Sequence, residues 1–229
     1  MRAVIFDMDG VLTDSEPLIC AAACGMFLER GLAVRPDDFL PFVGAGENRY
    51  IGGVAEKYGM AIDIGQAKAR TYELYLRMVP ERLAAFPGAV DLVLSCREAG
   101  LPCAVASSAD RIKIDANLRK IGLPPEMWQA VVTAEDVERR KPDPALFLKA
   151  AERLGAVPSE CTVVEDAVNG IAAAKAAGMR CVAVASTFPA GLLGQADLVR
   201  ASIVEVTLSD LLVLPASLSA KPSETLAAL

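Results

Sequence analysis

Hydrophobic positions along the chain follow two alternating periods. Uninterrupted apolar runs, typical of strands buried on both faces of a parallel sheet, occupy residues 4–6, 102–106, 130–132, 162–164 and 181–184. Beyond residue 86, apolar positions between these runs recur every three or four residues, which is the helical period. Strands that alternate with helices build parallel sheets, so the pattern predicts an α/β fold with a doubly wound, Rossmann-like sheet. A weaker run at 196–199 predicts a last edge strand, and residues 209–212 predict a short helix.

The segment from residue 16 to residue 83 departs from this alternation. Its apolar residues repeat only with helical spacing, and nothing in it favours a strand. A helical block placed after one strand predicts a small all-helical cap domain inserted into an α/β core. We therefore expect a core formed by residues 1–15 and 84–213, and a cap formed by residues 16–83. Residues 214–229 are rich in Ser, Ala, Pro and Lys without a clear period, and predict a polar tail or linker.

Charge and hydropathy limit the partners of the chain. The net charge of −6 argues against nucleic acid as a partner. No apolar run approaches the roughly 20 residues of a membrane span, so we expect no membrane contact. The first predicted strand begins near residue 3 and leaves no room for a signal peptide. We therefore expect a cytoplasmic protein, or one of an organelle stroma if an upstream targeting segment has been removed.

Two residue types narrow the chemistry. The six cysteines are scattered without a C-x-x-C pair, which favours reduced core residues over a disulfide framework or a zinc site. The chain contains no histidine, which excludes Ser-His-Asp catalysis and histidine metal sites. Acid–base chemistry must therefore use carboxylates or, as the weaker alternative, lysine or tyrosine.

Two carboxylates follow the first predicted strand. Asp7 and Asp9 are separated by one residue, and Gly10 follows them. If the chain is still extended there, both side chains point the same way at the carboxyl end of the strand, where open α/β sheets bind ligands. Two acids held together repel each other unless one is protonated or a cation joins them. This pair predicts a hard divalent cation, with Mg²⁺ the usual choice beside phosphate.

Three later loops follow predicted strands and therefore lie on the same sheet edge. Ser107 stands between a strand and a helix, where its hydroxyl and nearby N–H groups can hold a phosphate oxygen or simply cap the helix. Lys141 precedes a turn made rigid by two prolines, and is either an aimed cation or part of a solvated charge run. Glu165 and Asp166 follow an apolar run as the first acid pair does, although acids at a helix start also complement its dipole.

These four segments resemble, in order, the four motifs of the haloacid dehalogenase superfamily of phosphohydrolases. The first motif is similar to D-M-D-G-V-L-T-D-S at residues 7–15. The others are similar to the Ser107 loop, to K-P-D-P at 141–144 and to the acid pair at 165–166. The resemblance covers roughly residues 2–212 and is weakest in the cap. It points to the branch with a helical cap that includes β-phosphoglucomutase-like and phosphoglycolate-phosphatase-like enzymes.

The resemblance implies a role for each matching residue. Asp7 would attack phosphorus and become an aspartyl-phosphate, while Asp9 would act as general acid and then as general base. Ser107 would bind the transferring phosphoryl group, with backbone contacts from Ser108. Lys141 would neutralise the phosphate and the nucleophile. Linkers near both ends of the cap would let it close over the substrate.

The resemblance also implies the metal and the reaction. Mg²⁺ would be held by the Asp7 carboxylate, the Asp9 backbone carbonyl and Asp166, with Glu165 as a direct or water-mediated ligand. We therefore expect a Mg²⁺-dependent phosphomonoester hydrolase that acts on a small phosphorylated metabolite. Several polar residues of the cap and of the helix after Ser107 can face that substrate or be solvated: Glu47, Asn48, Arg49, Arg111 and Lys113.

Two alternatives stay open at this point. One is a sugar-phosphate mutase of the β-phosphoglucomutase type, although those enzymes carry a histidine where this chain has Ile19 or its neighbours. They also carry a cap arginine earlier than Arg49 stands here. The other alternative is a regulatory or interaction module that keeps the fold inside a longer protein, with other domains of that protein as its partners.

Overall fold

The computed structural model describes residues 2–44 and 46–212 of the chain. Its centre is a six-stranded sheet with strand order β3-β2-β1-β4-β5-β6, in which every neighbouring pair is parallel. The strands are β1 (Ala3–Phe6), β2 (Cys103–Ala106), β3 (Ala130–Val132), β4 (Cys161–Glu165), β5 (Arg180–Val184) and β6 (Leu198–Arg200). The five main apolar runs are therefore all strands, and the edge strand expected at 196–199 is shifted toward the C-terminus.

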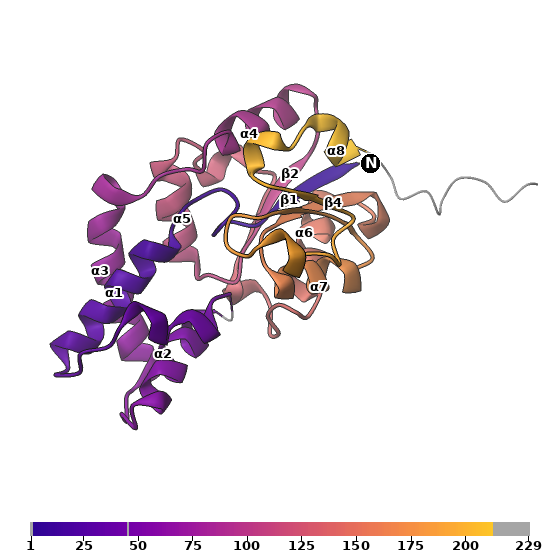
Figure 1. Ribbon diagram of the computed structural model, residues 1–229. Coiled ribbons are helices and arrows are strands. Elements are labelled where there is room, and N and C mark those ends of the chain that lie inside the picture. The colour runs from indigo at the N-terminus through magenta and orange to yellow at the C-terminus, as the bar shows by residue number, and fades with distance from the viewer. Residues whose placement is uncertain (1, 45, 213–229) are drawn as a thin grey trace, which may run out of the picture.

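Helices cover both faces of the sheet, which makes the core three layers deep (Figure 1). On one face lie α4 (Ala89–Glu98), α5 (Arg111–Lys120) and the short α8 (Leu208–Leu212). On the other face lie α6 (Ala145–Leu154) and α7 (Val168–Ala176). This arrangement confirms the predicted doubly wound α/β class.

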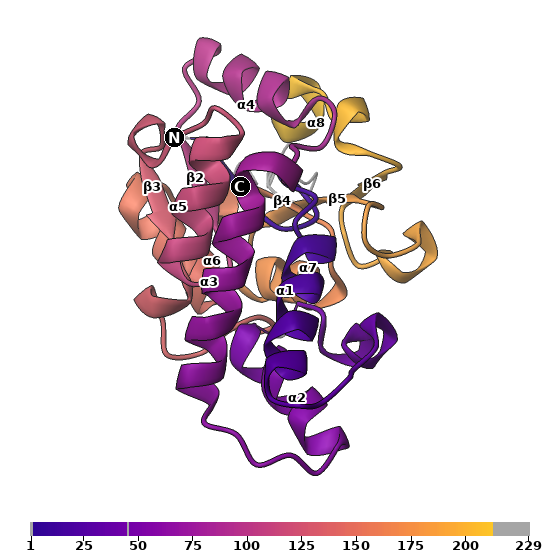
Figure 2. The same ribbon diagram turned by 90° about the vertical axis from the view of Figure 1, so that its left-hand side faces the viewer.

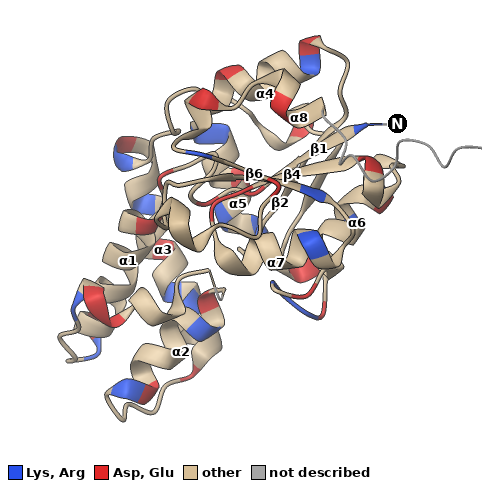
Figure 3. Cartoon of the chain, turned by 45° about the vertical axis from the view of Figure 1, so that its right-hand side comes forward, with Lys and Arg blue, Asp and Glu red and all other residues tan. Residues whose placement is uncertain are grey.

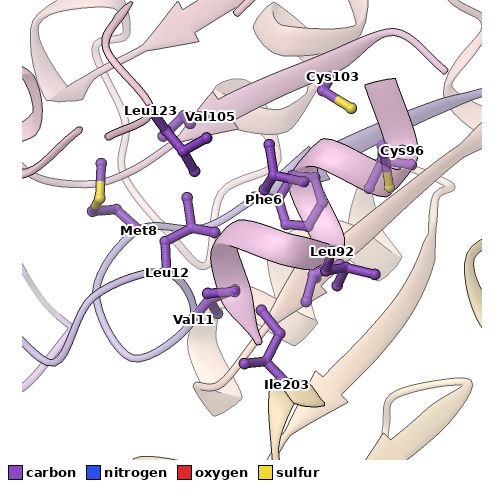
Figure 4. Packing of buried hydrophobic residues seen from close by; sticks show 14 of the residues in the cluster. Phe6, Met8, Val11, Leu12, Leu92, Cys96, Cys103, Val105, Leu123 and Ile203 are labelled. Atoms are coloured by element: carbon purple, nitrogen blue, oxygen red, sulfur yellow. The ribbon is translucent and has the colours of Figure 1, made fainter. Parts of the chain in front are cut away.

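Side chains that leave the strands on alternate faces build two separate apolar clusters. Phe6 and Val105 point into the cluster beneath α4, where they meet Leu12 and Leu92 (Figure 4). Ile5 points the opposite way, into the cluster beneath α6 and α7. Strand β1 lies between β2 and β4 and is buried on both faces, so the position of its carboxyl end is fixed.

The segment between β1 and α4 is helical, as predicted. It contains α1 (Glu16–Glu29), α2 (Glu47–Lys57) and α3 (Ile64–Arg82), which lie together to one side of the sheet (Figure 1). These helices bury their own apolar cluster, in which the rings of Phe39 and Tyr50 stack with centroids 4.7 Å apart. We call this block the cap. The limits proposed for it, residues 16–83, stay a prediction.

The cap joins the core at one place. Thr13 pairs with Ala85 in an isolated antiparallel bridge, so the outgoing and returning chain segments run side by side. Away from these crossings, α3 of the cap packs along α5 of the core (Figure 2), and Tyr75 Oη donates to Asn117 Oδ1 at 2.7 Å. The cap is therefore held to the core by the two chain crossings, by the packing of α3 along α5 and by the ion pair between Glu47 of α2 and Lys113 of α5.

Several further observations complete the fold. Single turns of 3₁₀ helix occur at Pro36–Asp38, Leu40–Phe42, Pro125–Met127, Ala134–Asp136, Pro158–Glu160, Ala190–Leu192 and Ile203–Glu205. All six cysteines are free thiols, four of them buried. Within the described ranges, no helix is long and apolar enough to cross a membrane. Charged residues of both signs are spread along cap and core (Figure 3). The predicted tail at 214–229 lies outside the described residues.

Candidate active site

The carboxyl ends of three neighbouring strands open into one pocket. Asp7 directly follows β1, Ser107 directly follows β2, and Glu165 is the last residue of β4 with Asp166 after it. Because β1 lies between β2 and β4, these side chains line one pocket although Asp7 and Ser107 are 100 residues apart in sequence and Ser107 and Glu165 are 58 residues apart. The pocket lies between this sheet edge and the cap, because residues of α1 and α2 form its other wall.

Lys141 joins two of the acids. Its Nζ donates to Asp7 Oδ1 at 2.5 Å and to Glu165 Oε1 at 2.6 Å. The lysine side chain is only 6% exposed, so both ion pairs are shielded from water. Burial lowers the pKa of Lys141, but the carboxylates of Asp7 and Glu165 outweigh it and raise that pKa above its usual value. The lysine is therefore an aimed cation and not part of a solvated charge run.

Three buried acids crowd around this lysine. Oxygen atoms of Asp7, Glu165 and Asp166 all lie within 4.8 Å of one another. Burial raises the pKa of Asp7 to about 7 against the attraction of Lys141, and burial together with Glu165 and Asp7 raises the pKa of Asp166 well above its usual value. One lysine does not balance three carboxylates at such short range, and a cluster of carboxylate oxygens suits a hard cation. The residues present therefore fit a Mg²⁺ ion.

Glu165 is more constrained than the other two acids. Its Oε2 accepts from the backbone N–H groups of Asp166 and Ala167, both at 2.7 Å, while Oε1 meets Lys141. A Cβ atom at Gly170 of α7 would collide with this carboxyl group, so glycine is needed there for close approach. Gly10, with φ of 81°, is needed likewise, since a Cβ atom there would collide with the Asp166 carboxyl.

Asp9 lines the same pocket but meets a different lysine. Strand β1 ends at Phe6, so the chain is no longer regularly extended when it reaches the second acid. Lys113 Nζ of α5 donates to Asp9 Oδ2 at 2.7 Å, and Ser15 Oγ donates to Asp9 Oδ1. The two acids are therefore held separately, Asp7 by Lys141 and Asp9 by Lys113.

The loop after β2 forms a third side of the pocket. Ser107 Oγ accepts from the N–H of Ala109 at 3.2 Å, as in a tight turn that precedes a helix. Ser108 also lines the pocket, and its Oγ is buried with no hydrogen-bond partner among the described residues. Ser107 and Ser108 thus line the same pocket as Asp7 and Lys141.

The sequence left five polar residues open, and the structure divides them, with Asn48 exposed and absent from the lining of this pocket. Glu47 and Lys113 line the pocket and are buried, so the alternative that they are solvated surface residues is wrong for both. Arg49 instead pairs with Glu56 at 2.7 Å on the outer side of α2, and Arg111 donates to the carbonyl oxygen of Val131 at 3.1 Å. Helical spacing alone does not say which face of a cap helix turns toward the core.

The pocket residues that sequence reasoning missed include two polar residues of the cap. Glu16, the first residue of α1, accepts from Tyr50 Oη at 2.7 Å, and both side chains line the pocket. Burial raises the pKa of Glu16 above its usual value, with an opposing effect from Tyr50. They lie on two different helices of the cap and no motif contains them, so only the packing of the cap brings them to the site.

Comparison with known sequences decides the family. The sequence model for haloacid dehalogenase-like hydrolases matches residues 1–178. The chain belongs to this family. The four sequence motifs indicated a hydrolase of this family, so the resemblance is confirmed.

Individual relatives agree with this assignment. Hexitol phosphatase A of Escherichia coli is 33% identical over 91% of this chain and 94% of its own length. SUPPRESSOR OF QUENCHING 1, a chloroplastic protein of Arabidopsis thaliana, is 48% identical over 93% of this chain, but the chain spans only 21% of that protein. Among solved structures, CbbY from Rhodobacter sphaeroides in complex with phosphate has a TM-score of 0.83 and is 25% identical, with 92% of this chain and 99% of that chain covered. The chain is thus a phosphatase of the haloacid dehalogenase type.

Proposed function

We propose that this chain hydrolyses the phosphate monoester of a small metabolite through an aspartyl-phosphate on Asp7, with Mg²⁺ as cofactor. One observation carries the proposal: a buried lysine holds Asp7 and Glu165 together beside Asp166 in a pocket that also contains Asp9 and two serine hydroxyls. Phosphoryl transfer needs a nucleophile in line, neutralisation of charge and a proton for the leaving group. The pocket offers one set of groups for each of these needs.

We assign the metal to the carboxylates of Asp7 and Asp166 and to the backbone carbonyl of Asp9. Both oxygens of Glu165 already accept hydrogen bonds, so we assign it to contact with the ion through water while it orients Lys141. Mg²⁺ bound there would stabilise the negative charge of the transferring phosphoryl group. Every other step belongs to side chains of the protein.

The first step forms a bond between a carboxylate oxygen of Asp7 and phosphorus, while the bond from phosphorus to the leaving oxygen breaks. Asp9 gives its proton to that oxygen, so the product leaves as an alcohol. In the second step Asp9 takes a proton from water, the water oxygen attacks phosphorus, and the bond to Asp7 breaks. Inorganic phosphate leaves and both acids return to their starting states. Lys113 and Ser15, which contact Asp9, would hold its carboxyl group in place between the two steps.

We assign the binding of the phosphate oxygens to Ser107, Ser108 and Lys141, which would donate hydrogen bonds to them. The buried Ser108 Oγ has no partner among the described residues, so a phosphate oxygen would supply one. Donors that are already in position at the start of the reaction stabilise the charge that develops in the transition state. The phosphate complex of the CbbY structure and the phosphatase names of several relatives support phosphate as the group that this pocket binds.

Hydrolysis is favoured over the mutase alternative by the position of Arg49. Its guanidinium pairs with Glu56 and lies 5.0 Å from the centroid of the Phe42 ring, and Arg49 is not among the residues that line the pocket. Arg49, which stands later in the sequence than the cap arginine of the mutases, therefore does not take the place of that arginine in the pocket.

The test is a phosphate-release screen on phosphorylated sugars, sugar alcohols, glycolate and nucleotides, with and without Mg²⁺. We expect metal-dependent release that disappears in Asp7→Asn and falls by about 10²–10⁴-fold in Asp9→Asn. The second variant keeps the nucleophile, so it separates the acid–base role from the nucleophilic role. Silence of folded, Mg²⁺-binding wild-type protein across the panel would instead favour the regulatory-module alternative.

We also propose that this phosphatase domain occurs within a longer protein of an organelle. The Arabidopsis thaliana relative is chloroplastic, which supports the organelle. It is nearly five times longer than the region it shares with this chain, which supports the longer protein. An antibody against the domain, used on fractionated cells of the source organism, would test them. A full-length band in the cytosolic fraction would count against the organelle and favour the cytoplasmic expectation.

A further inference from the structure

The part of the pocket beyond the phosphate site carries more acids than cations. Its walls there include the carboxyl groups of Asp9, Glu16 and Glu47, and the ammonium group of Lys113. This region faces the cap, so it would receive the part of the substrate that leaves with the ester oxygen. The excess of carboxyl groups in these walls therefore affects which leaving groups the pocket can bind.

The cations of the pocket are already engaged. Among the described residues that line it, Lys113 and Lys141 are the only two. Lys113 is 3% exposed and lies 2.7 Å from Asp9 Oδ2 and 3.5 Å from Glu47 Oε1, so two carboxylates already surround it. Lys141 is taken by Asp7 and Glu165. Arg140 lies outside the lining, with its guanidinium 3.9 Å from Asp110.

Glu47 provides an acceptor that lacks a donor. Its side chain lines the pocket and the residue is only 7% exposed. One oxygen, Oε1, faces Lys113, while Oε2 is buried and has no hydrogen-bond partner among the described residues. A buried carboxylate oxygen is costly to leave unpaired, so it selects a ligand that brings a donor. A hydroxyl group brings one, whereas a carboxylate or a second phosphate brings more negative charge.

We infer that the leaving group is an uncharged polyhydroxyl chain or ring, that one of its hydroxyls donates to Glu47, and that the pocket rejects substrates with a second anionic group. This inference rests on the proposed function and adds the chemical class of the substrate. Glu47 is the residue that determines specificity, and Glu16 adds negative charge to the same wall. Tyr50, bound to Glu16, places a further hydroxyl beside it.

Matched substrate pairs test this inference. Sorbitol 6-phosphate and 6-phosphogluconate differ at one end of the chain, which is a hydroxymethyl group in the first and a carboxylate in the second. Glycerol 3-phosphate and 3-phosphoglycerate form a shorter pair, and p-nitrophenyl phosphate reports the reaction itself. With the full chain and Mg²⁺, we expect kcat/KM to favour at least one polyol phosphate over its partner on the order of tenfold or more.

Two variants of α2 connect the preference to Glu47. Glu47→Gln removes the charge at nearly constant shape and supplies an N–H donor, so the ratio of kcat/KM within the preferred pair should move about tenfold toward the carboxylate. Most of that movement should appear in KM for the carboxylate substrate. Glu56→Gln makes the same charge change on the exposed side of the same helix, next to Arg49, and should leave the ratio unchanged. Melting temperatures of both variants check that they fold.

The outcomes separate the two levels of the proposal. Turnover of p-nitrophenyl phosphate without a preference for either polyol phosphate would overturn the inference alone. So would a ratio that is the same in Glu47→Gln as in the wild type. If none of the five compounds is hydrolysed, the proposed function fails and the inference fails with it.

Discussion

At the scale of single residues, charge balance in the site depends on two lysines. Lys141 is the cation for Asp7 and Glu165, and Lys113 is the cation for Asp9 and Glu47. Both ammonium groups are buried, so bulk water does not compensate the carboxylates when one of these lysines is removed. Loss of one partner from a buried ion pair leaves an uncompensated charge, which costs far more than loss of a surface pair.

Replacement of Lys141 should therefore destabilise the protein as well as inactivate it. We expect Lys141→Met to lower the free energy of unfolding of the metal-free protein by ~3–5 kcal/mol, because Asp7 and Glu165 lose their shared cation. Urea unfolding in EDTA measures the loss, and excess Mg²⁺ should recover part of it. Lys149→Met on α6, where the lysine pairs with Glu152 near the surface, is the matched control and should cost less than about 1 kcal/mol. Equal losses in the two variants would contradict this prediction.

The raised pKa of Asp7 predicts how stability of the metal-free protein depends on pH. Asp7 in the folded state keeps its proton up to about pH 7, whereas the unfolded chain releases it near 3.8. The folded state therefore binds more protons in this range, and the contribution of Asp7 to stability is present below 3.8 and lost as pH rises toward 7. Asp7→Asn should remove that contribution, so the melting temperature of the variant relative to wild type should rise with pH.

The same group predicts how metal binding depends on pH. Mg²⁺ competes with the proton of Asp7, so the increase in wild-type melting temperature on addition of Mg²⁺ should grow from pH 5 to about pH 7. Melting curves at four pH values, with EDTA or with Mg²⁺, measure both effects. A Mg²⁺ effect that is constant over this range, or unchanged in Asp7→Asn, would exclude Asp7 as a ligand.

At the scale of elements, the site depends on how closely α7 approaches the end of β4. Gly170 makes that approach possible, because a side chain there would occupy the space of the Glu165 carboxyl group. The carboxyl group cannot move far, since it is held by Lys141 and by two backbone amides. The carboxyl group of Glu165 can therefore keep its position beside Asp166 only if residue 170 of α7 has no side chain.

We expect Gly170→Ala to reduce phosphate release at least about tenfold, because displacement of Glu165 misplaces Lys141 and Asp7, the proposed nucleophile. Gly52→Ala in α2 is the matched control: its added Cβ atom would meet only the end of the Ile64 side chain at 3.4 Å. Alanine is the better helix former, so this control should be neutral or stabilising by up to about 1 kcal/mol. Kinetics and urea unfolding of both variants make the comparison, and similar activities would show that α7 tolerates the shift.

At the scale of the whole molecule, the position of the cap decides whether the pocket is complete. Asp9, Lys113 and Lys141 belong to the core, while Glu16, Glu47 and Tyr50 belong to the cap, and all of them line one pocket. The packing of α3 along α5 keeps the two parts together away from the chain crossings. The hydrogen bond from Tyr75 to Asn117 lies in that contact and is buried.

Removal of this bond should loosen the cap. We expect Tyr75→Phe to cost ~1–3 kcal/mol of unfolding free energy, because Asn117 Oδ1 is left buried without its donor. Limited proteolysis should cleave the variant faster in residues 16–83 than the wild type. Tyr58→Phe removes a hydroxyl bond to Asp38 inside the cap, and so serves as a control that leaves the contact between cap and core intact. Cleavage that is unchanged in Tyr75→Phe would show that this hydrogen bond is not needed to hold the cap against the core.

Most of the core was predictable because its signals are local. The apolar runs that became β1, β2, β3, β4 and β5 lack polar alternation, and the rule that ligands bind at the carboxyl ends of parallel strands placed the motif residues at one edge of the sheet. The strand order itself was not predicted. The pocket wall where the cap meets the core was not predictable either. Glu47 and Lys113 are charged residues on amphipathic helices, and their burial depends on the angle at which cap meets core, which no period in the sequence encodes.

The bridge between Thr13 and Ala85 has a further consequence. Because the cap leaves and re-enters the core at adjacent points, a short loop can close that gap without stretching the sheet, and a different insertion can occupy it at a small cost in loop entropy. The acids and serines of the proposed catalytic site lie at the ends of β1, β2 and β4 in the core, while Glu16, Glu47 and Tyr50 bring the inserted part into the wall of the pocket. Such a chain can exchange its substrate in evolution by replacing one removable module and keeping its catalyst.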